Sequence, residues 1–209
     1  MTEKVKWEGK VTSVQPRIRL NRSFDERSHG YLGFSLRVEG HVAGVQMTFW
    51  VGIGKAAQAK HQLQVGLRAD GAARPVADSR MEAVDYYKVS GLNVTGGSER
   101  DARHSPPWHD IPPTLEVYRE RGHRRLSSRT YQAKCSSCIW GCRMPVVITL
   151  DQWNPSQLQY RFETFCYGPK SCGFYKPGPT RKVPGRSGMS WEEEDWVDEE
   201  ATAHRGINE

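Results

Sequence analysis

The chain has 209 residues, of which 37% are hydrophobic and 26% charged, and glycine and proline contribute 20 and 12 residues. Because apolar residues are few and turn formers are many, we expect small β-rich units joined by linkers. No apolar run approaches the roughly 20 residues that a membrane-spanning helix needs. Residues 1–10 alternate charged and apolar side chains and form no apolar signal segment. These features predict a cytoplasmic protein with no membrane partner.

Charge is distributed unevenly along the chain. The last 20 residues, from Ser190, hold eight of the 24 acids and one of the 30 lysines and arginines, so they carry a formal charge of −7 and the first 189 residues carry +13. A body this basic attracts polyanions, because each neutralised phosphate releases condensed counterions. Many mildly basic proteins bind no nucleic acid, so charge alone leaves that function open.

The first third of the chain has the pattern of strands. Apolar and polar residues alternate along residues 5–11, 32–38 and 45–53, which is typical of half-buried strands. A basic, turn-like stretch at 16–30 separates the first two, and a glycine-bounded turn at 40–44 separates the next two.

The next elements are a short helix and two further strands. Residues 55–63 are mostly helix formers without β-branching. Strand-like segments follow at 65–69 and 83–94, joined by a loop that contains Gly71, Arg74 and Pro75. The predicted order is therefore three strands, a helix and two strands.

This order resembles the OB-fold, a five-stranded and partly open barrel. The resemblance covers residues 3–97 and rests on element order; a small SH3-like barrel is the structural alternative. It implies that oligonucleotides or oligosaccharides bind across the second and third strands, between the first and fourth loops. On this chain those surfaces would present, besides Thr48, Arg27, Arg74 and Arg80, the side chains of Arg17, Arg19, Arg22, Phe24, Arg37 and Trp50.

These residue types suit single-stranded nucleic acid. Guanidinium groups pair with phosphates, and an aromatic ring that stacks on a base contributes roughly 1–3 kcal/mol. The alternative is structural, since Trp50 could cover one end of the barrel and the arginines could form a solvated face.

Residues 96–114 are rich in glycine, serine and proline, and the paired prolines favour an extended connection. A dense basic segment follows at 115–129, either a short helix interrupted at Gly122 or an irregular arm. Its arginines are either phosphate contacts or partners of the acidic tail. As candidate phosphate contacts we select Arg121, Arg124 and Arg125.

Five cysteines, all between residues 135 and 172, give the strongest chemical signal. Cys135 and Cys138 form a C-x₂-C pair, and Cys166 and Cys172 follow after two predicted strands at 146–150 and 158–165. Paired thiols on either side of a hairpin resemble a zinc ribbon of the rubredoxin-like type, over residues 131–177. That resemblance implies a zinc ion held by Cys135, Cys138, Cys166 and Cys172, with folding coupled to metal binding.

The spacing leaves alternatives open. The second pair has five intervening residues instead of the usual two, and Cys142 is a fifth thiol. Cys135, Cys138 and Cys142 together with one later cysteine could instead hold a [4Fe–4S] cluster. In the zinc interpretation Cys142 is a small buried hydrophobe.

The end of the chain is a basic proline- and glycine-rich linker followed by an acidic segment with Trp191 and Trp196. Ser190 and Glu193 could form the capping box of a helix. The composition favours a solvated, partly disordered tail. Its alternatives are a peptide that binds a protein partner through the tryptophans and an acidic flap over the protein's own basic surface.

The sequence thus predicts a mainly β protein: an OB-like barrel with one short helix, and a cysteine-rich zinc-ribbon-like hairpin. The expected units are residues 1–97 (barrel), 98–130 (linker and basic segment), 131–177 (metal-binding domain) and 178–209 (basic linker and acidic tail). We predict a protein that binds single-stranded DNA or RNA and carries a structural metal; the alternatives are an iron–sulfur redox protein and a protein-interaction adapter. No P-loop, dinucleotide-binding turn or catalytic grouping is visible, so no enzyme is predicted.

Overall fold

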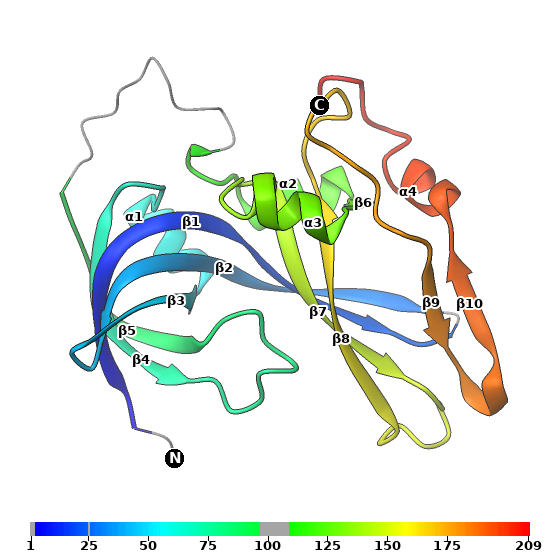
Figure 1. The fold of residues 1–209 in the computed structure, drawn as a ribbon, viewed down its shortest axis with the longest axis horizontal. Coiled ribbons are helices and arrows are strands. Elements are labelled where there is room, and N and C mark those ends of the chain that lie inside the picture. The colour runs from blue at the N-terminus through cyan, green and yellow to red at the C-terminus, as the bar shows by residue number, and fades with distance from the viewer. Residues whose placement is uncertain (1–2, 25, 97–108) are drawn as a thin grey trace.

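The structure, a computed structural model, describes residues 3–24, 26–96 and 109–209, so residues 98–108 of the expected linker lie outside the described residues. The fold is mainly β, as predicted (Figure 1). Its strands are β1 (Val5–Arg22), β2 (Arg27–Val42), β3 (Val45–Ile53), β4 (Arg68–Pro75), β5 (Tyr86–Thr95), β6 (Arg124–Arg125), β7 (Gly141–Thr149), β8 (Leu158–Cys166), β9 (Arg181–Pro184) and β10 (Ser190–Glu193). Its helices are α1 (Lys55–His61), α2 (Leu115–Arg121), α3 (Ser128–Thr130), the π-helical turn η2 (Tyr131–Cys135), the 3₁₀ turn η3 (Arg186–Gly188) and α4 (Asp195–Ala201).

The first five strands, which we call the N-terminal sheet, pair in the order β2-β3-β5-β4-β1, and β2 also pairs with β1. The pairing therefore returns to its starting strand. All of these pairs are antiparallel except β3 with β5, which meet in parallel at Val51 and Tyr86. Helix α1 lies between β3 and β4, where the sequence predicted a helix.

Strand β1 is longer than the sequence indicated and joins the two sides of the molecule. Its first residues pair with β4, and its last three, from Leu20, pair in parallel with β7. Ile18 and Leu20 are only 1% and 2% exposed, so alternation continues through the stretch expected as a turn. The intervening arginines hid this pattern. Figure 1 shows β1 and β2 crossing from the N-terminal sheet toward β7 and β9.

Strand β4 also differs from expectation, because it continues through residues 71–75, which were expected to form a loop. Its inward residues are small: Ala69 and Ala73 are 2% and 0% exposed, and Gly71 faces the indole of Trp7. A Cβ at Gly71 would lie 3.5 Å from Trp7 Nε1. The large Trp7 side chain fills the space that β4 leaves, so β4 needs no apolar pattern of its own.

The C-terminal side is built on the predicted hairpin of β7 and β8, in register from Gly141 opposite Cys166 to Thr149 opposite Leu158. Helix α2 ends at Gly122, as one of the two interpretations expected. This glycine has φ of 63°, and a Cβ there would lie 2.2 Å from the carbonyl oxygen of Ala201. The close approach brings α2 against the end of α4.

The tail is folded, which differs from the expected solvated segment. β9 and β10 form an antiparallel pair, and α4 follows β10. The helix begins at Asp195 because residues 190–193 are already used as a strand. Val197 and Arg205 are both 6% exposed, so the tail contributes to the interior.

The main core lies between the two sides. It combines inward residues of the N-terminal sheet, such as Val38 and Phe49, with residues of β7 and β8, such as Val146 and Phe165. Within the described ranges, no helix combines the length and apolar character needed to cross a membrane.

Candidate functional site

The outer face of β2 and β3 carries an arginine beside a tryptophan. Arg37 lies directly opposite Trp50 in the β2–β3 register, so both side chains are on the same face. Both are partly exposed. The backbone N–H of Trp50 donates to Asp85 Oδ2 over 2.8 Å, which ties β3 to the loop between β4 and β5.

A second guanidinium crosses this face. A Cβ on Gly52, two residues along β3, would lie 2.6 Å from Arg17 Nη1, so glycine leaves the room that Arg17 occupies. Glu82 in the β4–β5 loop pairs with Arg17 at 3.0 Å and with Arg19 at 2.8 Å. One carboxylate therefore pairs with two arginines. Arg17 and Arg19 were expected in the first loop but lie in β1.

Strand β7 contributes a further arginine. Arg143 is exposed and stacks over the Phe162 ring at 3.7 Å from the ring centre. The charges of both Arg143 and Arg37 act on the buried Tyr131, whose pKa burial raises. Among the described residues, neither arginine has a carboxylate within 4 Å. We call Arg17, Arg37, Trp50 and Arg143 the basic face.

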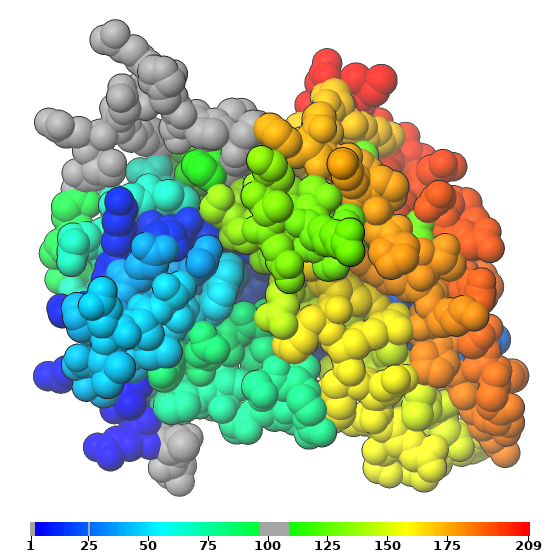
Figure 2. All heavy atoms as spheres, viewed as in Figure 1, coloured from blue at the N-terminus to red at the C-terminus, as the bar shows by residue number. Residues whose placement is uncertain are grey.

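The β4–β5 loop closes the contact between the two sides. Arg80 pairs with Asp78 at 2.8 Å, and its guanidinium lies 4.5 Å from the centre of the Tyr160 ring on β8. Figure 2 shows the spheres of this loop against those of β8. Arg74, expected in the loop, lies in β4 instead.

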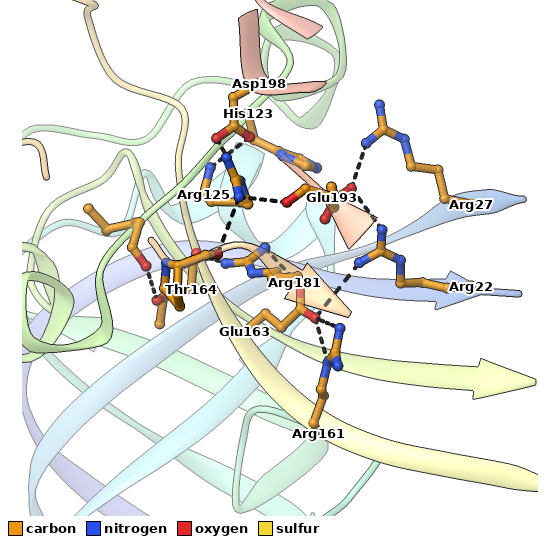
Figure 3. Close-up of polar contacts among 12 residues, drawn as sticks. Arg22, Arg27, His123, Arg125, Arg161, Glu163, Thr164, Arg181, Glu193 and Asp198 are labelled. Atoms are coloured by element: carbon orange, nitrogen blue, oxygen red, sulfur yellow. Dashed lines mark hydrogen bonds and ion pairs between the residues drawn. The ribbon is translucent and has the colours of Figure 1, made fainter. Parts of the chain in front are cut away.

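The tip of the β1–β2 hairpin is bound by the acidic tail (Figure 3). Glu193 accepts hydrogen bonds from Arg22 over 2.7 Å and from Arg27 over 3.1 Å. Burial alone would raise the pKa of Glu193, but the charges of Arg22, Arg181 and Arg27 hold it below its ordinary value. Phe24 packs against Gly185, where a Cβ would lie 3.0 Å from the ring.

Two further charges complete this buried network. Glu163 pairs with Arg161 at 2.6 Å and with Arg181 at 2.8 Å. Arg181 also donates to the Thr164 carbonyl over 2.7 Å and stacks on Phe165. The network joins β1, β2, β8, β9 and β10, which Figure 3 shows converging.

Arg125 is the most deeply buried charge, with a side chain 1% exposed. Its Nε donates to Asp198 over 2.9 Å, and Nη1 donates to the Glu193 carbonyl over 2.7 Å. Asp195 is its second carboxylate partner. Arg22 and Arg125 are therefore held inside the protein, and we leave both out of the interface proposed below.

A histidine pair lies beside this network. His29 Nε2 and His123 Nε2 are 2.8 Å apart, so one ring donates a hydrogen bond to the other. Burial, together with the charges of Arg27 and Arg22, lowers the pKa of His29 to about 4. Burial also lowers the pKa of His123 well below its ordinary value. Both rings are therefore neutral near pH 7.

Four of the five cysteines are neighbours. Cys135 and Cys166 are buried in one small apolar cluster with Leu126 and Tyr131, and Cys138 packs against it. Cys172 lies near enough for its charge to act on the thiols of both Cys135 and Cys166. Cys142 is elsewhere: it is 0% exposed in the main core, and its thiol donates to the Pro16 carbonyl over 3.3 Å.

The backbone around these thiols is tightly turned. Cys138 N donates to Cys135 O over 3.1 Å, and Gly168 N donates to Cys166 Sγ over 3.4 Å. Gln15 Nε2 on β1 binds the carbonyls of Cys135 and Cys138 over 2.8 and 2.9 Å. Burial raises the pKa of the Cys135 thiol to about 11 and that of Cys138 to about 12. The free thiols of Cys135 and Cys138 are therefore protonated near pH 7.

The four thiols are close to one another, but their side chains are not arranged as metal ligands. Across residues 3–24, 26–96 and 109–209, no three His, Cys, Asp or Glu side chains are arranged to hold a metal ion. The remaining predicted arginines lie next to this cluster. Arg121 Nε donates to Tyr167 O over 2.8 Å, and Arg124 Nη2 donates to Pro169 O over 3.0 Å.

Comparison with models of protein families, with curated proteins and with solved structures finds no match for this chain.

Several of these residues were missed by sequence reasoning. Arg143 lies inside the β7 strand pattern, and Glu82 lies in a loop with no motif around it. Arg205 is a lone cation in an acidic segment. Its positive charge among negative neighbours was the one sequence feature that could have drawn attention to it, because an isolated arginine among acids is a candidate for an internal contact.

Proposed function

We propose that this chain binds single-stranded nucleic acid through the basic face. The proposal takes the N-terminal sheet to be an OB-like barrel. Two observations support that interpretation: the pairing order returns to β1, and α1 lies between β3 and β4. In such barrels the second and third strands present the ligand-binding surface, and these strands carry Arg37 and Trp50.

The pair of Arg37 and Trp50 carries the proposal. The two side chains are adjacent on one face and partly exposed, and the Arg37 guanidinium has no ion-pair partner in the described part of the chain. An exposed indole provides a stacking platform for a base, and an unpaired guanidinium beside it provides a contact for the phosphate that follows. Arg143 extends the positive surface onto β7.

The distribution of charge supports this choice of face. Glu193, Asp195 and Asp198 of the tail pair with Arg22, Arg27 and Arg125, at the opposite end of β1 and β2 from the β2–β3 turn. None of these ion pairs includes Arg37 or Arg143, and the charge of Asp85 acts on Arg143. Binding through backbone phosphates and stacking is insensitive to base sequence, so we propose little sequence preference.

Fluorescence anisotropy with labelled oligo(dT) and oligo(U) of about 20 nucleotides, at about 50 and 200 mM salt, tests this function. Trp50→Ala removes the stacking surface, and we expect a loss of about 1–3 kcal/mol in binding free energy. The double variant Arg37→Gln and Arg143→Gln removes two phosphate contacts. We expect it to reduce the slope of log K against log salt by about 1.4.

The matched control is Arg186→Gln, because Arg186 is equally charged and exposed but lies in the turn between β9 and β10. It should leave both the affinity and the salt slope unchanged. Anisotropy that stays flat at low salt would overturn the function. In that case the exposed Trp191 and Trp196 make the adapter function the next hypothesis to test.

We propose in addition that Cys135, Cys138, Cys166 and Cys172 hold a structural zinc ion. Structural zinc sites bind the ion with four cysteine or histidine ligands, and four cysteines are one of the common sets. The donor set here fits it: four neighbouring thiols, of which Cys166 already accepts a backbone N–H. The side chains would have to turn toward a common point to form a tetrahedron. Once bound, zinc would cross-link the turns on either side of the β7–β8 hairpin.

Metal analysis of purified protein separates the alternatives. One zinc per chain, abolished in Cys166→Ser but retained in Cys142→Ser, is the expected result. A brown protein that absorbs near 400 nm after anaerobic purification would favour the iron–sulfur alternative. Protein without metal, in which all five thiols react with a thiol reagent after denaturation, would contradict both.

A further inference from the structure

Three arginines from different parts of the chain converge on the loop that follows Cys166. Arg121 and Arg205 both donate to the carbonyl of Tyr167, over 2.8 and 3.1 Å. Arg205 also donates to Gly168 O over 3.1 Å, and Arg124 donates to Pro169 O over 3.0 Å. Three consecutive carbonyls are thus bound by guanidinium groups. The same loop supplies the N–H of Gly168 to Cys166 Sγ.

The charges of these arginines are only partly balanced by nearby acids. The charge of Glu209 acts on Arg121 and Arg205, and Glu209 O lies 3.5 Å from Arg205 Nη1. Within the described ranges, none of the three forms an ion pair with a side-chain carboxylate. Arg205 is 6% exposed, and its Nε and Nη2 are buried without a hydrogen-bond partner, as is Nε of Arg124. Unpaired buried charge and unmet donors destabilise a fold. A further negative group beside these arginines would offset that cost.

The charges of all three arginines act on the thiol of Cys166. A divalent zinc ion with four thiolates is doubly negative, and a buried centre of that charge requires cations close by. Arg121, Arg124 and Arg205 provide them. A neutral thiol would not need them, because carbonyl groups alone can be satisfied by uncharged donors.

The end of the described chain holds Arg205 in this position. Ser171 N donates to Ile207 O over 2.9 Å, and Lys170 Nζ donates to Arg205 O over 3.0 Å. These contacts lay residues 205–207 across the loop between Cys166 and Cys172. These contacts also explain how Cys166 and Cys172 can act as a ligand pair with five intervening residues. The longer loop between them is held in place by residues 205–207.

We infer that Arg121, Arg124 and Arg205 form a cationic shell that stabilises a dianionic four-cysteine metal centre. The inference rests on the proposed zinc site and adds to it three positioning residues, one of which comes from the tail. The arginines do not ligate the metal. They bind the backbone of the ligand loop and compensate the charge of the thiolates.

Zinc competition with a chromophoric chelator, on the full-length zinc-loaded chain, tests the shell. Loss of an outer-shell partner typically lowers metal affinity about 10–100-fold. We expect a reduction of about tenfold or more in Arg205→Gln and in Arg124→Gln. Arg205→Lys retains the positive charge and should recover most of the zinc affinity. If Arg205 acted only by donating hydrogen bonds to carbonyl groups, glutamine, which is also a donor, would preserve the zinc affinity as well.

Arg186→Gln is the control for loss of one positive charge elsewhere, and it should bind zinc as the unaltered chain does. If Arg205→Gln fails to fold, the partly exposed Arg121 and Arg124 give variants that carry the same prediction. Equal zinc affinity in the unaltered chain and in all the glutamine variants would overturn the shell and leave the zinc site standing. An unaltered chain that binds no zinc would overturn both.

Discussion

The two sides of the molecule are stabilised in different ways. The N-terminal sheet encloses apolar side chains, and Leu36, Val38 and Phe49 are all 0% exposed. The C-terminal side shares the main core through β7 and β8 and adds a small second cluster, in which Leu126, Tyr131, Cys135 and Cys166 are buried. Around that cluster the interior is charged, and its buried residues include Arg125, Glu163, Arg181, Glu193, Asp198 and Arg205.

This difference shows where each side is vulnerable. An apolar core loses stability in proportion to the side-chain volume removed. A buried ion network loses stability when one partner is removed and the other is left unpaired. The N-terminal sheet should therefore respond to cavities, and the C-terminal side to changes of charge, pH and metal content.

The largest effect is expected for Arg125→Ala. It leaves Asp198 without its 2.9 Å partner and removes the donor to the Glu193 carbonyl. Breaking a buried pair on one side costs about 3–5 kcal/mol. Urea unfolding measures this loss, and Arg80→Ala is the control, since the exposed pair of Arg80 and Asp78 should contribute little to the free energy of unfolding. Equal effects of the two substitutions would contradict the contrast.

A cavity in the N-terminal sheet should rank next. Leu36→Ala removes a side chain that is 0% exposed on β2. We expect a loss of about 2–4 kcal/mol in the free energy of unfolding. Hydrogen exchange of the Leu36→Ala variant sharpens the comparison. The protection of backbone amides should fall in β1–β3 and stay unchanged in the tail strands β9 and β10. A larger loss of protection in the tail would refute the separation.

Acid should weaken the C-terminal side through the histidine pair. The pKa of His29 is about 4 in the folded protein, against an ordinary value of 6.5. Between pH 6.5 and pH 4, His29 is therefore protonated in the unfolded chain and neutral in the folded chain. The stability present above pH 6.5 is lost as the pH falls toward 4. The pKa difference corresponds to at most about 3 kcal/mol.

Urea unfolding at about pH 7 and about pH 5 measures this dependence. In His29→Gln the part of the pH dependence that comes from His29 should disappear. A variant with the slope of the unaltered chain would show that this histidine is not held neutral.

The smallest effect is expected at the contact between α2 and α4. Gly122→Ala places a Cβ that would lie 2.2 Å from Ala201 O, at a φ of 63°. We expect a loss of about 1–2 kcal/mol, from strain and displacement of α4. Gly54→Ala is the control, because a Cβ at Gly54 meets nothing within 4 Å. If both changes are neutral, α4 is not seated against α2.

The sequence predicted much of the fold because periodicity and turn residues are local signals. Strands β2 and β3, helix α1 and the β7–β8 hairpin all carry them. The extension of β1 to Arg22 was missed because its outward arginines look like a loop. Strand β4 was missed because its inward alanines and Gly71 are defined by the distant Trp7.

The candidate site residues likewise divide into those that local sequence patterns predict and those that depend on distant partners. Trp50 beside Arg37 follows from strand alternation and was accessible from sequence. The burial of Arg125 and the position of Arg205 were not, because each depends on partners more than 30 residues away along the chain. Net charge indicated that the tail and the basic body could meet, but it could not say which arginines would be used.

Photochemical cross-linking to a 4-thiouridine-substituted single strand, followed by peptide mapping, tests the proposed nucleic-acid face most directly. We predict cross-links concentrated in the peptide that contains Trp50, and their loss in the double variant Arg37→Gln and Arg143→Gln. Cross-links confined to the tail, or none at a concentration that saturates anisotropy, would contradict binding at this face.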